Sequence, residues 1–84
     1  PKVKLAKGRC LQEMGRHEEA LNLYETMDRN NRTVKLTKGR CLEEMGRYEE
    51  ALNLYETMDM RDSMVKLTKG RCLQAMGRHE EALA

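Results

Sequence analysis

The sequence has few of the residues from which most domains build a core. Tryptophan and phenylalanine are absent, tyrosine occurs three times and proline once. Leucine, alanine and methionine must therefore supply nearly all of the apolar volume, and 84 residues suffice for one domain at most. No apolar run reaches the roughly 18 residues that indicate a membrane helix, so we expect no contact with a membrane.

The chain also lacks a dominant charge. Lysine and arginine together number 16, aspartate and glutamate 14, and the two signs interleave to a net charge of +2. Nucleic-acid binding calls for basic residues that cluster on one face. The charge pattern therefore predicts no nucleic-acid partner.

Cysteine is scarce, and its spacing does not fit a metal site. Cys10, Cys41 and Cys72 stand 31 residues apart, with no CxxC pair and no histidine at ligand spacing, so we expect no metal and no disulfide framework. On neighbouring stacked helices they would lie about 8–10 Å apart, which exceeds the reach of a disulfide. We interpret each cysteine as a small buried hydrophobe, and three free thiols favour an intracellular, cytoplasmic location.

What the chain has instead is an internal repeat. Residues 4–28 and 35–59 differ at only three positions, and the pattern starts again at Lys66. A fixed period of this length indicates an array of supersecondary units. Because the sequence begins without methionine and stops within the pattern, we expect a fragment of a longer array. The predicted single repeat domain, residues 1–84, contains a first unit at 1–31, a second at 32–62 and a truncated third at 63–84.

The first half of each unit has the apolar spacing of an amphipathic helix. In the second unit Val34, Cys41, Leu42 and Met45 recur along one stripe of a 3.6-residue period. Gly46 follows the last apolar residue, where a helix commonly ends in a left-handed residue that glycine adopts without steric strain. We therefore predict that this helix ends at Gly46.

A second helix is expected from about Arg47 to Asp59, with Ala51 and Tyr55 on its inner face. The residues between units are turn formers. Asn31 and Asp62 hold equivalent positions there, and each is predicted to cap the helix that follows. No strand alternation occurs, so the predicted fold class is all-α.

One glycine lies inside the first helix of every unit, at a cost of about 1 kcal/mol relative to alanine. This cost is tolerable where a partner helix comes so close that a Cβ atom would clash. We expect the partner surface to be the small residue of the second helix, which makes each unit a tight helical hairpin. The expected contacts are Gly8 with Ala20, Gly39 with Ala51 and Gly70 with Ala82.

The order of these residues resembles the tetratricopeptide repeat: glycine, a large apolar residue, glycine at the turn, an aromatic ring, alanine, a second aromatic ring and an apolar residue. The resemblance implies hairpins stacked as a right-handed solenoid. The period of 31 residues is shorter than the usual 34, so the pitch of the solenoid is not implied. The matching residues are Gly8, Leu11, Gly15, His17, Ala20, Tyr24 and Met27, then Gly39, Leu42, Gly46, Tyr48, Ala51, Tyr55 and Met58, and then Gly70, Leu73, Gly77, His79 and Ala82.

Members of this family bind extended peptides in a concave groove formed by the first helices, which the resemblance carries over by position. The groove would present a series of arginines to a carboxylate or an acidic peptide. Alternatively, Arg9–Glu13 and Arg40–Glu44 are i,i+4 ion pairs on a solvated face. The candidate groove residues are Leu5, Arg9, Gln12, Glu13, Leu36, Arg40, Glu43, Glu44, Leu67, Arg71 and Gln74.

No catalytic constellation accompanies this groove. His17 and His79 align with Tyr48, which indicates a flat ring that packs rather than a ligand or a base. The sequence has no nucleophile–base arrangement within a repeat and no phosphate-binding glycine loop. We therefore expect no enzyme activity, no catalytic residue and no cofactor.

Two functions remain open. The first is a protein-interaction scaffold, whose partner is a protein or an extended and even repetitive peptide. The second is a structural array, engineered or recently amplified, without a specific ligand, because exposed residues such as Glu18 and Glu25 are kept between units. Binding of single-stranded RNA, as in the related pentatricopeptide repeats, would require a basic groove. The truncated third unit also predicts self-association, by end stacking or by exchange of a helix.

Overall fold

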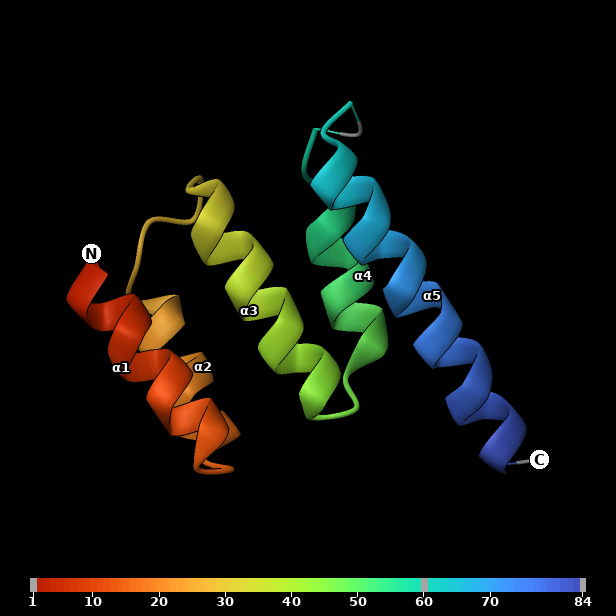
Figure 1. The fold of residues 1–84 in the computed structure, drawn as a ribbon, viewed down its shortest axis with the longest axis horizontal. Coiled ribbons are helices and arrows are strands. Elements are labelled where there is room, and N and C mark those ends of the chain that lie inside the picture. The colour runs from red at the N-terminus through yellow and green to blue at the C-terminus, as the bar shows by residue number, and fades with distance from the viewer. Residues whose placement is uncertain (1, 60, 84) are drawn as a thin grey trace.

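The computed structural model describes residues 2–59 and 61–83, and the side chains of residues 3–59 and 61–78. Five helices and no strand occur in the described part of the chain, which confirms the all-α class (Figure 1). The first four pair as two helical hairpins, each closed by a short turn; the right-handed solenoid stays a prediction. The helices are α1 (Lys2–Glu13), α2 (His17–Glu25), α3 (Arg32–Glu44), α4 (Tyr48–Glu56) and α5 (Ser63–Leu83).

The helices lie in two layers. In Figure 1, α1, α3 and α5 follow one another across the front of the molecule, with α2 behind α1. Helix α2 packs against both α1 and α3, and α4 packs against both α3 and α5. Each second helix is therefore shared between its own unit and the next one, and the core lies between the layers.

The turn within each hairpin is built around a glycine. Gly46 has a φ of +78°; its N–H donates to the carbonyl of Glu43 at 3.0 Å, and the N–H of Arg47 donates to that of Leu42 at 2.9 Å. These two bonds define a Schellman motif, in which a left-handed residue satisfies the last carbonyls of the helix. The predicted helix end at Gly46 is confirmed, and Gly15 forms the same turn with a φ of +79°.

The helices that follow the inter-unit turns are capped by side chains, as predicted. The Asn31 side chain accepts hydrogen bonds from the backbone N–H groups of Thr33 at 2.9 Å and Val34 at 3.2 Å. The Asp62 side chain accepts one from the N–H of Met64 at 2.9 Å. Each cap satisfies donors that the first turn of a helix leaves without a partner.

The buried cysteines join one unit to the next. Cys41 and Cys72 are fully buried, and their thiols donate to the carbonyl oxygens of His17 at 3.4 Å and Tyr48 at 3.6 Å. All three cysteines are free thiols. The prediction that each is buried was wrong for Cys10, which is exposed. This position packs against the second helix of the preceding unit, and within the described residues no helix precedes α1.

The mid-helix glycines contact tyrosines, so the expected partners were wrong. A Cβ atom on Gly8 or Gly39 would lie 2.3 Å from a ring carbon of Tyr24 or Tyr55, respectively. The flat ring, rather than an alanine methyl group, lies across the bare backbone. Ala20 and Ala51 are nevertheless fully buried in the core.

The third unit departs from this arrangement. Gly70 is exposed, and nothing lies within 4 Å of the position that its Cβ would take. The expected turn at Gly77 does not form, because α5 continues through it to Leu83. In the first two units, the turn is followed by a second helix that buries a tyrosine. The side chain of Ala82 lies outside the described residues.

Candidate functional site

A groove of about 550 Å³ crosses the face formed by α1, α3 and α5. It brings together most of the predicted groove residues, and Leu5, Leu67 and Gln74 are the predicted residues outside its lining. The predicted residues that line it are Arg9, Gln12, Glu13, Leu36, Arg40, Glu43, Glu44 and Arg71.

The lining also includes residues that the sequence reasoning missed, near the starts of α3 and α5. Helical phase could have identified Thr33 and Thr37, which precede Arg40 by about two turns and one turn on the same face. Met64 and Thr68 take the equivalent places on α5. They enter the groove because the start of α5 lies against the start of α3.

The groove arginines form no ion pair with any described side chain. Arg9, Arg40 and Arg71 are exposed, and no carboxylate lies within 4 Å of their side-chain nitrogens in the part of the chain whose side chains are described. The alternative with Arg9–Glu13 and Arg40–Glu44 ion pairs is therefore wrong for this structure. Three guanidinium groups at equivalent places on three helices face the groove.

Two of the three carboxylates in the groove lining, those of Glu43 and Glu44, in contrast accept hydrogen bonds. The Tyr55 hydroxyl donates to Glu43 at 2.6 Å. In the first unit, the Tyr24 hydroxyl donates to the Gln12 carbonyl oxygen, and the Gln12 amide donates to Glu44 across the boundary between units. Each tyrosine side chain therefore extends from the second helix of its unit, past the mid-helix glycine of the first helix, to the polar residues that line the groove.

The phenols are held in the protonated, donating form. Burial raises the pKa of Tyr24 to about 12, and the Arg9 charge opposes the rise. Burial, followed by the hydrogen bond to Glu43, raises the pKa of Tyr55 further. Both hydroxyls are therefore neutral donors at any physiological pH.

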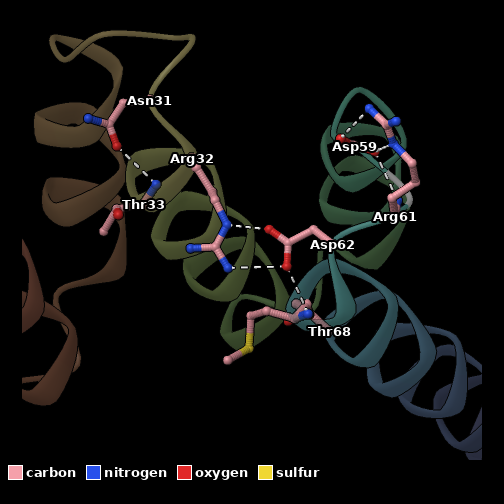
Figure 2. A network of polar contacts seen from close by, with 8 residues as sticks. Asn31, Arg32, Thr33, Asp59, Arg61, Asp62 and Thr68 are labelled. Carbon is pink, nitrogen blue, oxygen red and sulfur yellow. Dashed lines mark hydrogen bonds and ion pairs between the residues drawn. The ribbon is translucent and has the colours of Figure 1, made fainter.

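Arg32, which belongs to the groove lining, forms an ion pair between units with Asp62 (Figure 2). The Arg32 guanidinium, at the start of α3, donates through Nε and Nη2 to the carboxylate of Asp62, which also caps α5. The guanidinium holds the pKa of Asp62 below its ordinary value. Sequence reasoning identified Asp62 only as a cap, because the ion pair depends on how neighbouring units pack.

A second hollow, of about 610 Å³, lies between α2, α3 and α4. Its apolar wall includes Val34 and Leu54. Its lysines have polar partners: the ammonium of Lys38 lies 3.8 Å from Glu25, and that of Lys35 donates to Thr57 at 3.3 Å. Arg29 also lines this hollow and has no described ion pair, so the hollow presents one unpaired arginine where the groove on the other layer presents three.

The described residues contain no group of three histidine, cysteine, aspartate or glutamate side chains that could hold a metal. The Nδ1 atom of His17 is buried without a hydrogen-bond partner, and the side chain of His79 is not described. Among the described helices, none combines the length and the apolar character that crossing a membrane requires.

Comparison with known families identifies the repeat. A family model described as tetratricopeptide repeat matches residues 11–64, which is more than half of the chain. The chain belongs to this family. Tetratricopeptide repeats act in general as protein-interaction scaffolds and are generally non-enzymatic. No curated protein and no solved structure matches the chain.

Proposed function

We propose that the chain is a non-enzymatic scaffold that binds an extended acidic peptide of a partner protein in the groove across α1, α3 and α5. The observation that carries this proposal is the series Arg9, Arg40 and Arg71, exposed on three successive helices without a described ion pair. Guanidinium groups bind carboxylates through short, charge-assisted hydrogen bonds, and often through two at once.

The charge balance of the groove supports an acidic ligand. Arg32 is engaged by Asp62, Glu43 accepts from Tyr55, and Glu44 accepts from Gln12. Of the ionised groups in the lining, the three arginines and Glu13 are left without a described partner. Because the arginines recur once per unit, a peptide with carboxylates at regular intervals would satisfy all three.

The alternative, an array without a specific ligand, is weakened by contacts at its outer surface. Glu25 lies 3.8 Å from Lys38 of the next unit, and Glu56 lies 3.7 Å from Lys69 in the same way. Glu18 likewise approaches Arg47 at 4.0 Å. These three exposed glutamates therefore contact the next unit, which offers a structural reason for their retention besides recent amplification or engineering.

The test is calorimetric titration of short glutamate-rich peptides into the chain and into a variant with Arg9, Arg40 and Arg71 all changed to Glu. The matched control changes Lys4, Lys7 and Lys66 to Glu, three exposed cations outside the groove lining. We expect at least tenfold weaker binding for the groove variant and a small change for the control. Equal losses in both variants would indicate non-specific attraction, and absence of binding to the unaltered chain would favour the array without a ligand.

The cellular location of the chain is a proposal as well. Three free thiols, of which two are buried, suit the reducing conditions of the cytoplasm. We propose that the chain meets its partner there. Fractionation of cells that produce the protein, followed by antibody detection, would test this.

A further inference from the structure

Of the described residues that line the groove, two have apolar side chains, and both lie in the first halves of their helices. Leu36 belongs to α3 and Met64 to α5. Leu36 packs in part against the core, whereas Met64 is 49% exposed. Methionine adapts its shape to a neighbour and is common on surfaces that bind apolar side chains. The exposed Met64 therefore gives the groove an apolar contact that the arginines do not provide.

The charged and hydroxyl groups beside Met64 already have partners. Arg32 forms its ion pair with Asp62, so these two charges compensate each other. The Thr68 hydroxyl donates to the carbonyl oxygen of Met64 at 2.8 Å, so this donor is used within α5. This part of the groove therefore offers a ligand apolar contact rather than an unpaired charge.

The unpaired arginines lie further along the same two helices. Arg71 follows Met64 by seven residues, and Arg40 follows Leu36 by four, which corresponds to about 10 Å and about 6 Å along a helix axis. About three residues of extended chain span 10 Å. One extended peptide can therefore contact Met64 with one side chain and an arginine with another, a few residues away.

We propose that Met64 and Leu36 form a subsite for an aliphatic side chain of the acidic peptide. The ligand would then carry a residue such as leucine within a few positions of the carboxylates that the arginines bind. This inference rests on the proposed function, because the aliphatic side chain and the carboxylates belong to the same peptide. It narrows the ligand class, since the arginines alone do not distinguish one acidic peptide from another.

The subsite also fixes the register of the peptide. The residue equivalent to Met64 on α3 is Thr33, so the apolar contact is not repeated there, whereas the arginines recur on three helices. A peptide with evenly spaced carboxylates could shift by one unit and still contact arginines. A peptide with an aliphatic residue as well would lose its contact with Met64 on such a shift.

The test is a calorimetric comparison of two glutamate-rich peptides that differ at one central residue, which is alanine in one and leucine in the other. Each is titrated into the unaltered chain and into Met64→Thr, which introduces the residue that α3 carries at this place. We expect the leucine peptide to bind the unaltered chain at least about threefold more tightly, because burial of its extra carbon atoms favours binding. Met64→Thr should remove most of this difference and leave the affinity for the alanine peptide nearly unchanged.

Met14→Thr is the matched control, because Met14 is 63% exposed and lies outside the groove lining. It should keep the advantage of the leucine peptide. The advantage should also persist at high salt, which weakens the contribution of the arginines. Circular dichroism checks that each variant keeps its helices.

The outcomes separate this inference from the proposed function. If neither peptide binds the unaltered chain, the proposed function fails and the subsite fails with it. If both bind with equal affinity, or if Met64→Thr keeps the advantage of leucine, the subsite is refuted while the proposed function stands. A loss of the advantage in Met14→Thr as well would also refute the subsite, because the effect would not depend on the groove.

Discussion

The ring of Tyr55 lies in the space where Gly39 lacks a Cβ atom, and its hydroxyl donates to Glu43, one turn further along α3. One side chain thereby connects the second layer of helices to the floor of the groove. Tyr24 repeats this relationship with Gly8 and Gln12. The mid-helix glycines therefore serve both the packing of the hairpin and the polar lining of the groove.

The first prediction compares two glycines in identical local sequence. Gly39→Ala should lower the free energy of unfolding by about 1–3 kcal/mol, because its Cβ would overlap the Tyr55 ring. Gly70→Ala should raise it by up to about 1 kcal/mol, because nothing opposes the new methyl group and alanine favours helix. Urea unfolding followed by circular dichroism measures both. Equal effects of the two variants would contradict the assigned role of the tyrosine.

Asp62 has two functions that substitution can separate. Asp62→Asn should keep the cap on α5, as Asn31 caps α3, and lose only the ion pair with Arg32, which should lower the stability only slightly because the pair is exposed to solvent. Asp62→Ala should lose about 1 kcal/mol more, because it also removes the cap. The measurement is urea unfolding at neutral pH. If the asparagine variant were as unstable as the alanine variant, the cap would not be the separate contribution that the structure shows.

The same pair predicts a pH dependence. The pKa of Asp62 is lowered in the folded chain from its ordinary value of 3.8, so the unfolded state binds its proton first as the pH falls. The contribution of the ion pair is complete above the ordinary pKa and is lost as the pH falls through the folded value. The stability difference between the unaltered chain and Asp62→Asn should therefore shrink from pH 6 toward about pH 2. A difference that stays constant over this range would refute the linkage.

Helices, caps and much of the groove could be predicted because they depend on local patterns. The apolar spacing predicted the helices of the first two units. The turn residues predicted that Gly46 ends one helix and that Asn31 caps another, and the helical period predicted that Arg40 and its equivalents share one face. The partner of Gly39 could not be found in this way. The residue of α4 that contacts Gly39 depends on the axial offset between α3 and α4. No local sequence pattern predicts this offset.

The third unit shows the limit of local sequence. The glycine of the M-G-R segment ends a helix at Gly15 and Gly46, yet lies within α5 at Gly77. The turn residues by themselves therefore do not decide whether the helix ends. Cys10 and the pair Arg32–Asp62 illustrate the same point, because their environments depend on neighbouring units.

Thiol reactivity should distinguish the three units. Cys10 is exposed, whereas burial raises the pKa of Cys41 and of Cys72 to about 11. At pH 8 the buried thiols carry very little thiolate, which is the reactive form. A disulfide reagent should therefore modify one thiol quickly and the other two only as the chain opens. Cys10→Ser should abolish the fast phase, and three fast thiols in the unaltered chain would show that the hairpins do not pack as described.

The last prediction concerns the charge that the second unit places in the groove. Glu43 and Gln12 hold equivalent positions, and each accepts a hydrogen bond from its tyrosine hydroxyl. Glu43→Gln should therefore keep the bond from Tyr55, as the first unit shows, and remove one negative charge beside Arg40. Stability should change little, because a neutral acceptor replaces a charged one in the same contact.

Affinity for a glutamate-rich peptide should then rise several-fold, and the rise should diminish at high salt, because screening weakens the repulsion that the substitution removes. Glu49→Gln, on the exposed start of α4 and outside the groove lining, is the matched control and should leave affinity nearly unchanged. Calorimetric titration at two salt concentrations measures both variants. Weaker binding by Glu43→Gln would mean that Glu43 attracts the ligand, and the partner would then carry positive charge instead.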